Sequence, residues 1–415
     1  MSSVRFHYGW IILATATLVV FGSLGLARFG YSVVLPSMQV GLSMDNTQTG
    51  ALATANLVGY LSLSLIGGVL ASRFGPRVVI STGLALAGLA MVLTGRAEGF
   101  ADTAFWRAVT GVGSGASNVP VMGLLAAWFG SRRRGLAAGI AASGSSLALI
   151  LLGPGVPRIL EAYGAEGWRI CWYLFGGAVL LLAFISLAFL RNRPADLGLK
   201  PLGQEAGSVP PQKSSTGGLD WARVYRSGIV WHMGLVYVAF GFSYIIYVTF
   251  FVKHLIASGG YTPAAAGAMF MTMGWCSIVC GLLWGWVSDR IGRRGALVIV
   301  YLIHTTSFAL FGLWSAPTGF LLSAILFGLS AWSIPAIMAA ACGDVLGPRL
   351  APAALGFITL FFGIGQAAGP SVAGAMADAA GSFHSAFLLA AAVAFLGAIA
   401  SLLLRKPSDA HPPSP

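Results

Sequence analysis

The sequence predicts an all-α membrane protein with twelve transmembrane helices in two pseudo-symmetric halves of six. Of its 415 residues, 57% are hydrophobic and only 9% are charged, and the mean hydropathy is +0.83. A soluble chain carries about a quarter charged residues. Apolar runs long enough to cross a hydrocarbon core of about 30 Å recur along the whole chain. A third observation is an internal repeat that relates the two halves.

Breaks at glycine, proline and charged clusters divide the chain into its spans. The first apolar run continues to Pro36 without a cleavage site of small residues, so it is expected to be a retained span and not a signal peptide. The twelve spans are expected to begin near residues 9, 48, 77, 103, 136, 167, 228, 262, 295, 317, 351 and 383.

A polar segment rich in proline, glycine and serine separates the sixth span from the seventh. Such a composition is typical of a linker. We therefore expect a six-helix bundle over residues 1–190, a cytoplasmic linker over 191–226 and a second six-helix bundle over 227–405. The polar end of the chain, residues 406–415, is expected to be a disordered tail.

The arginine and lysine residues predict the orientation in the membrane. With the N-terminus in the cytoplasm, 18 of the 24 basic residues lie in cytoplasmic segments, and the opposite orientation leaves only the other six there. The positive-inside rule therefore favours cytoplasmic positions for both termini. The formal net charge of +12 is interpreted as a topology signal, and no nucleic-acid partner is expected.

Four short matches between the halves occur in the same order at offsets of 215 to 217 residues, which indicates a duplication. Two parallel halves related by an axis along the membrane normal suit an alternating-access transporter whose site lies between them. The matched pairs include Arg73 with Arg290, Asn118 with Ser333, Gly153 with Gly369 and Arg28 with Tyr244.

Three motifs lie beside or within the spans. The loop after span 8 reads "GWVSDRIGRR" over residues 285–294, a degenerate copy "GVLASRFGPR" covers residues 68–77, and span 4 contains "RAVTGVGSG". On these motifs the chain resembles the major facilitator superfamily over essentially its whole length. The resemblance implies the twelve-helix fold and alternating access. It assigns gating or conformational roles to Arg73, Arg77, Arg107, Asp289, Arg290, Arg293 and Arg294.

The stretches "HYGWIILA" and "RNRPADLGLKPLG" are similar to bacterial members related to monocarboxylate transporters. In those relatives an arginine in span 8 typically holds the substrate carboxylate, but span 8 here, "MFMTMGWCSIVCGLLWGW", has no basic residue. The first loop motif also has Ser72 where the family pattern has an acid. A cation that holds an anionic substrate must therefore come from another span, and Arg28 is the leading candidate.

All twelve acidic residues fall in loops, tails or span ends, whereas Arg28 lies inside span 1. A charge at the centre of a membrane helix costs about 2.5–3.5 kcal/mol and is usually functional. A guanidinium can hold a carboxylate or sulfonate through two hydrogen bonds, although snorkelling to headgroups is the alternative. The expected substrate-binding residues are Arg28, Tyr31, Asn118, Tyr244 and Tyr247, followed by Asn56, Tyr60, Ser333 and Gln366.

These features predict a secondary active transporter of a small organic anion, such as a monocarboxylate, and not an enzyme. The sequence has no ATP-binding P-loop, so transport is expected to be proton-coupled or an exchange of anions, with the proton on the substrate or on His304. Two alternatives stay open. One is an exporter of hydrophobic drugs or metabolites, which the aromatic span 7 favours, and the other is a membrane sensor that binds a ligand without transporting it.

The remaining expectations concern partners and location. We expect a monomer that spans the inner (cytoplasmic) membrane many times, with the lipid bilayer, the anion and a coupling proton or exchanged anion as its partners. The four cysteines lie in or beside predicted spans without the spacing of metal ligands, so no metal or other cofactor is expected.

Overall fold

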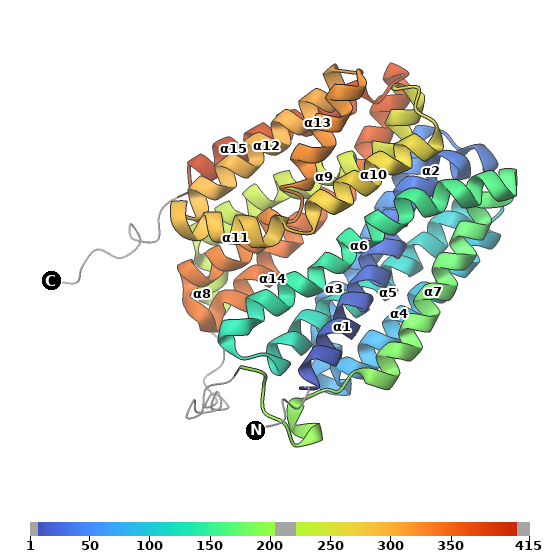
Figure 1. Ribbon diagram of the computed structural model, residues 1–415. Coiled ribbons are helices and arrows are strands. Elements are labelled where there is room, and N and C mark those ends of the chain that lie inside the picture. The colour runs from blue at the N-terminus through green and yellow to red at the C-terminus, as the bar shows by residue number, and fades with distance from the viewer. Residues whose placement is uncertain (1–6, 204–220, 405–415) are drawn as a thin grey trace, which may run out of the picture. The chain divides into compact units, whose positions relative to one another are not determined.

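The computed structural model describes residues 7–203 and 221–404, and every regular element in these ranges is a helix (Figure 1). The elements before the linker are α1 (Gly9–Val20), η1 (Phe21–Phe29), α2 (Gly30–Gly41), α3 (Asn46–Phe74), α4 (Pro76–Arg96), α5 (Phe100–Trp128), α6 (Ser131–Tyr163), η2 (Gly164–Glu166), α7 (Gly167–Phe189) and η3 (Pro194–Leu197). Those after it are α8 (Trp221–Arg226), α9 (Gly228–Ala257), α10 (Pro263–Ser277), α11 (Cys280–Ile291), α12 (Arg293–Leu313), α13 (Pro317–Gly328), α14 (Ser333–Ala380) and α15 (His384–Leu402).

The chain forms two compact units. One comprises Met1–Ser43 with Ala55–Ser215, and the other comprises Met44–Thr54 with Thr216–Pro415, so the boundary falls inside α3. In the first unit α4 packs against α5 and α7, and α6 packs against α1 and η1 (Figure 1). In the second unit α9 packs against α14 and α15, and α12 packs against α13 and α15.

The predicted span starts agree with the helices. Eleven of them fall within five residues of a helix start, and the twelfth, near residue 351, follows the non-helical Gly347 inside the long α14. In the described ranges, eight helical stretches are long and apolar enough to cross a membrane, or nine if the bent α3 is one span. Helices α10 and α11 fall outside this set because a break at 278–279 leaves them only 15 and 12 residues long.

The first part of the predicted linker is attached to the first unit. The backbone N–H of Leu202 donates to the Trp128 carbonyl at 2.8 Å, and the N–H of Gly130 donates to the Leu202 carbonyl at 3.0 Å. The carboxylate of Asp196 accepts from the backbone N–H of Arg193 at 3.0 Å. The predicted linker residues 204–220 and the predicted tail 406–415 lie outside the described residues.

In the second unit the N-terminus of α3 is capped by a carboxylate from another helix. Asp378, near the end of α14, accepts hydrogen bonds from the backbone N–H groups of Asn46 at 3.0 Å and Thr47 at 2.7 Å. The first N–H groups of a helix have no partner within the helix, and a negative charge there is favourable. The cap therefore holds the start of α3 against α14.

Glycines set the distance between α3 and α5 in the first unit. A Cβ atom at Gly111 would lie 1.9 Å from the carbonyl oxygen of Asn56, and one at Gly59 would lie 2.0 Å from that of Ala108. Small residues let membrane helices approach closely. This approach brings the polar side chains of the two helices together.

We expect Gly111→Ala to force α3 and α5 apart. Overpacking typically destabilises by about 1–3 kcal/mol, so the Tm of the detergent-purified protein should fall. Gly123→Ala is the matched control on the same helix, because a Cβ atom there meets nothing within 4 Å. An unchanged Tm for Gly111→Ala would contradict the close packing of these helices.

Candidate functional site

Arg28 lies in an unusual part of the first helix. The segment η1 around it is a π-helix of nine residues. Such helical turns are rare in proteins, and those that occur often lie at functional sites. The guanidinium carbon of Arg28 lies 4.4 Å from the ring centroid of Tyr60, a cation–π contact. One guanidinium NH₂ group is buried without a hydrogen-bond partner, and no carboxylate pairs with Arg28 among the residues that the structure describes. Arg28 therefore carries an uncompensated positive charge.

Tyr60 links Arg28 to a third helix. The side-chain Nδ2 of Asn118, on α5, donates to the Tyr60 hydroxyl at 2.9 Å. The Oδ1 atom of Asn118 is buried and has no hydrogen-bond partner. We call Arg28, Tyr60 and Asn118 the Arg28 cluster. It brings together three of the predicted substrate-binding residues, and all three side chains are half-buried.

Arg107 lies beside this cluster and is only 1% exposed. Its guanidinium donates to the carbonyl oxygen of Ala27 at 2.7 Å and lies 4.8 Å and 5.0 Å from the rings of Tyr31 and Trp172. Arg107 thus bonds to the backbone of the residue that precedes Arg28. Because Ala27 immediately precedes Arg28, Arg107 holds the backbone of the π-helical segment.

Two further predicted substrate residues lie around Arg107. Tyr31 is 2% exposed and stacks on the Arg107 guanidinium, and Asn56 donates from Nδ2 to the Arg107 carbonyl at 3.0 Å. Both positions support a role in packing Arg107 against the first helix. Trp172, the second ring on Arg107, is a residue that the sequence analysis missed, because a tryptophan in an apolar span gives no signal that distinguishes it from lipid-facing or core tryptophans.

In the second unit Tyr244 and Gln366 form a buried pair. The Gln366 amide donates to the Tyr244 hydroxyl. The Tyr244 ring stacks on Phe240 at 4.6 Å between centroids and meets the half-buried Trp332 edge-on at 6.4 Å. Offset and edge-on arrangements are the favourable geometries for aromatic rings. Phe362 continues this stack 5.9 Å from Tyr244.

Tyr247 and Ser333 lie in the packed interior of the second unit. Tyr247 is fully buried among phenylalanine rings, and its hydroxyl shares a hydrogen bond of 2.7 Å with Ser323. The Ser333 hydroxyl donates to the Ser330 carbonyl at 2.5 Å. His304 is also fully buried, between aromatic rings, and neither ring nitrogen has a hydrogen-bond partner.

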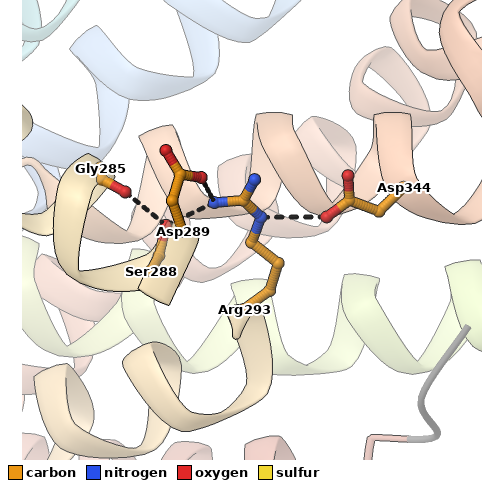
Figure 2. Close-up of polar contacts among 5 residues, drawn as sticks. All are labelled: Gly285, Ser288, Asp289, Arg293 and Asp344. Atoms are coloured by element: carbon orange, nitrogen blue, oxygen red, sulfur yellow. Dashed lines mark hydrogen bonds and ion pairs between the residues drawn. The ribbon is translucent and has the colours of Figure 1, made fainter. Parts of the chain in front are cut away.

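The second loop motif forms an ionic triad of Asp289, Arg293 and Asp344 (Figure 2). The Arg293 guanidinium pairs with Asp289 on α11, bonds to Asp344 on α14 at 3.0 Å, and donates to the Ser288 hydroxyl at 2.6 Å. A cavity of about 940 Å³ in this unit is lined by the triad together with Arg290 and Arg294. Arg290 also lies over the Trp286 ring at 3.8 Å.

Asp344 was absent from the predicted set. The signal for it was an acidic residue at a span end, on the side where the predicted orientation places most of the basic residues.

The first loop motif is built differently. Ser72 donates to the Val69 carbonyl at 2.7 Å, and Arg77 donates to the Leu187 carbonyl at 2.8 Å. Arg73 is exposed and lies 5.4 Å from the ring of Phe74. The first unit thus holds its motif through backbone carbonyls, whereas the second unit uses carboxylates.

We expect Arg107→Leu to lower the Tm of the purified protein, because it removes the bond to Ala27 and both ring contacts. A hydrogen bond from a charged group contributes about 1.5–3 kcal/mol. Arg96→Leu is the control, since Arg96 is an exposed arginine at the end of α4 in the same unit. Equal Tm values for the two variants would show that Arg107 does not hold the π-helical segment.

The chain is similar to known membrane transporters. A family model described as "Uncharacterised MFS-type transporter YbfB" matches residues 20–402. The probable sulfoacetate transporter SauU of Cupriavidus necator is 25% identical over 404 residues, which cover 91% of this chain and 89% of the relative. Human monocarboxylate transporter 11 is 27% identical over 402 residues, which cover 94% of this chain and 81% of the relative.

The fold is also similar to that of a solved transporter. A bacterial homologue of the human lysosomal transporter Spinster, in an inward-facing and unoccupied conformation, superposes with a TM-score of 0.75 at 17% identity, covering 96% of this chain and 98% of that one. The predicted all-α fold and the predicted resemblance are confirmed. The chain is a multi-pass membrane transporter and belongs to the major facilitator superfamily.

Proposed function

We propose that this transporter carries a small organic anion by secondary active transport and alternating access. The observation that carries the proposal is the uncompensated charge of Arg28, whose buried NH₂ group has no partner. The names of two relatives support it, since sulfoacetate and monocarboxylates are both small organic anions. We further propose that both termini lie in the cytoplasm and that the protein acts in the inner membrane.

The electrostatics of the first unit favour an anion. A charge inside the membrane is costly unless it pairs or faces an aqueous cavity. Arg28 lies over the face of Tyr60, and no carboxylate pairs with it in residues 7–203 and 221–404. Arg107, bonded to the carbonyl before Arg28, adds a second positive charge. A carboxylate or sulfonate at Arg28 would supply two charge-assisted hydrogen bonds.

We assign substrate contacts to the Arg28 cluster in the first unit and to Tyr244, Gln366 and Trp332 in the second. The repeat supports this assignment, because Tyr244 aligns with Arg28. The cluster offers a positive charge within the first unit, and the Tyr244–Gln366 pair offers neutral polar groups beside aromatic rings within the second. Tyr31, Asn56 and Arg107 are proposed to position the first helix.

The driving force is a gradient of protons or of an exchanged anion. The proton would cross on the substrate or on His304, the buried histidine of α12. The ionic triad is proposed to hold α11, α12 and α14 in one arrangement during the cycle. Its bonds join three helices through one guanidinium, so a change in their packing must break at least one bond.

A second candidate is an exporter of hydrophobic compounds. It is favoured by the parallel rings of Tyr237, Phe240, Tyr244 and Phe362, whose centroids lie 4.6 to 6.2 Å apart. Such a stack gives an apolar body a surface to pack on. This candidate leaves the charge of Arg28 without a role.

The proposal is tested by uptake of radiolabelled lactate into proteoliposomes. We expect Arg28→Ala to raise KM by about 10- to 150-fold, because a hydrogen bond to a charged group is worth about 1.5–3 kcal/mol. The KM of Arg28→Lys should lie between the wild-type value and that of Arg28→Ala, because lysine keeps the positive charge and loses the planar guanidinium. Arg96→Ala is the surface control. Saturable uptake by Arg28→Ala with an unchanged KM would refute the anion site.

The triad predicts a change in rate without a change in affinity. Asp344→Asn removes one of its ion pairs, and an exposed pair is worth about 0.2–1 kcal/mol, which shifts a conformational equilibrium by about 1.4- to 5-fold. We therefore expect the maximal uptake rate to fall severalfold while KM stays the same. Glu161→Gln, at an exposed position near the end of α6, is the control. A changed KM at constant rate would place Asp344 in substrate binding instead.

A further inference from the structure

Two atoms of the Arg28 cluster are buried without a hydrogen-bond partner. One of them needs an acceptor and the other needs a donor. The Arg28 NH₂ group can only donate, and the Asn118 Oδ1 atom can only accept. Leaving a buried polar atom unpaired costs about 1–3 kcal/mol, and more when the group is charged. The cluster thus has one open donor and one open acceptor.

In the structure the Asn118 amide turns its nitrogen toward Tyr60. The Tyr60 hydroxyl accepts from Asn118 Nδ2 at 2.9 Å, so Oδ1 is the atom that remains. The neighbouring hydroxyl of Ser117 has the carbonyls of Gly113 at 2.8 Å and Ile80 at 3.2 Å as alternative acceptors. One turn earlier on α5, the Ser114 hydroxyl is also buried without a hydrogen-bond partner.

Tyr60 also sets the separation of the two open atoms. The Arg28 guanidinium lies over the face of the ring, and the Asn118 amide lies at its hydroxyl end. A ligand that reaches both must carry an acceptor for Arg28 and a donor for Asn118. A second carboxylate or sulfonate in the donor's place would meet the lone pairs of Oδ1 and be repelled.

We propose that the transported anion is a short hydroxy acid, and that Asn118 determines this specificity by accepting a hydrogen bond from the substrate hydroxyl. The proposal rests on the proposed function and names the substrate class of the same site. Arg28 holds the carboxylate, and Asn118 Oδ1 takes the hydroxyl. An acid without a hydroxyl satisfies Arg28 and leaves Oδ1 unpaired.

The test compares matched acids as competitors of labelled lactate uptake in proteoliposomes. The pairs are lactate with propionate and 3-hydroxybutyrate with butyrate, and sulfoacetate is the probe with two anionic groups. A neutral hydrogen bond is worth about 0.5–1.5 kcal/mol, so the wild-type protein should prefer each hydroxy acid by about 2- to 13-fold. Sulfoacetate should compete less well than either hydroxy acid.

Asn118→Leu should abolish the preference, because it weakens the binding of the hydroxy acids and leaves that of the other acids unchanged. Asn118→Ala is the smaller alternative if the leucine variant does not fold. Asn192→Leu is the matched control, because the Asn192 amide caps the Arg77 backbone N–H far along the chain from the cluster. It should keep the wild-type preference.

Three results would overturn the inference: equal competition within each pair in the wild-type protein, a preference that survives in both Asn118 variants, or stronger competition by sulfoacetate. If lactate uptake by Arg28→Ala still shows a raised KM, the anion-transport proposal stands and only the hydroxyl specificity fails. If uptake does not depend on Arg28, the proposed function itself fails.

Discussion

The first unit contains two guanidinium groups with buried nitrogen atoms, those of Arg28 and Arg107, and no carboxylate pairs with either among the described residues. Arg107 donates to the carbonyl of Ala27, the residue before Arg28, and lies against two aromatic faces, while its Nε atom is buried without a hydrogen-bond partner. Arg28 lies over the face of Tyr60, and one of its NH₂ groups is buried without a hydrogen-bond partner. Since desolvated charge is expensive, the helices around it are constrained to supply carbonyls and rings at fixed positions. The close glycine contacts between α3 and α5 and the π-helical segment of the first helix both serve that arrangement.

The two units handle their polar groups differently although their sequences repeat. The second unit places a neutral amide–hydroxyl pair, Gln366 with Tyr244, at positions related to the cationic region of the first. It also keeps the ionic triad of Arg293, which the first unit has replaced with serine and backbone bonds. The two halves of the fold therefore differ in chemistry: the first unit carries a buried guanidinium against aromatic rings, and the second carries a carboxylate-based connection between helices.

The spans were predictable because length, hydropathy and breaking residues are local properties, and the helix starts at Gly167, Gly228 and Pro317 coincide with the predicted ones. Arg28, Tyr60 and Asn118 were each identifiable as polar residues in apolar spans. Their grouping was not, because it depends on the rotation of three helices about their axes. The same limit explains Tyr247, where a regular aromatic spacing is shared by residues that line a cavity and residues that fill a core.

The sequence by itself determined that the chain crosses a membrane many times, that it is a duplicated transporter fold, and that it carries a deep arginine without a deep acid. The tertiary structure alone decided that Arg28 lies over Tyr60, that Asn118 donates to the Tyr60 hydroxyl, and that Arg107 donates to the carbonyl before Arg28. The physical reason is that composition and periodicity act along one helix, whereas these contacts need side chains from separate helices to meet within hydrogen-bond distance.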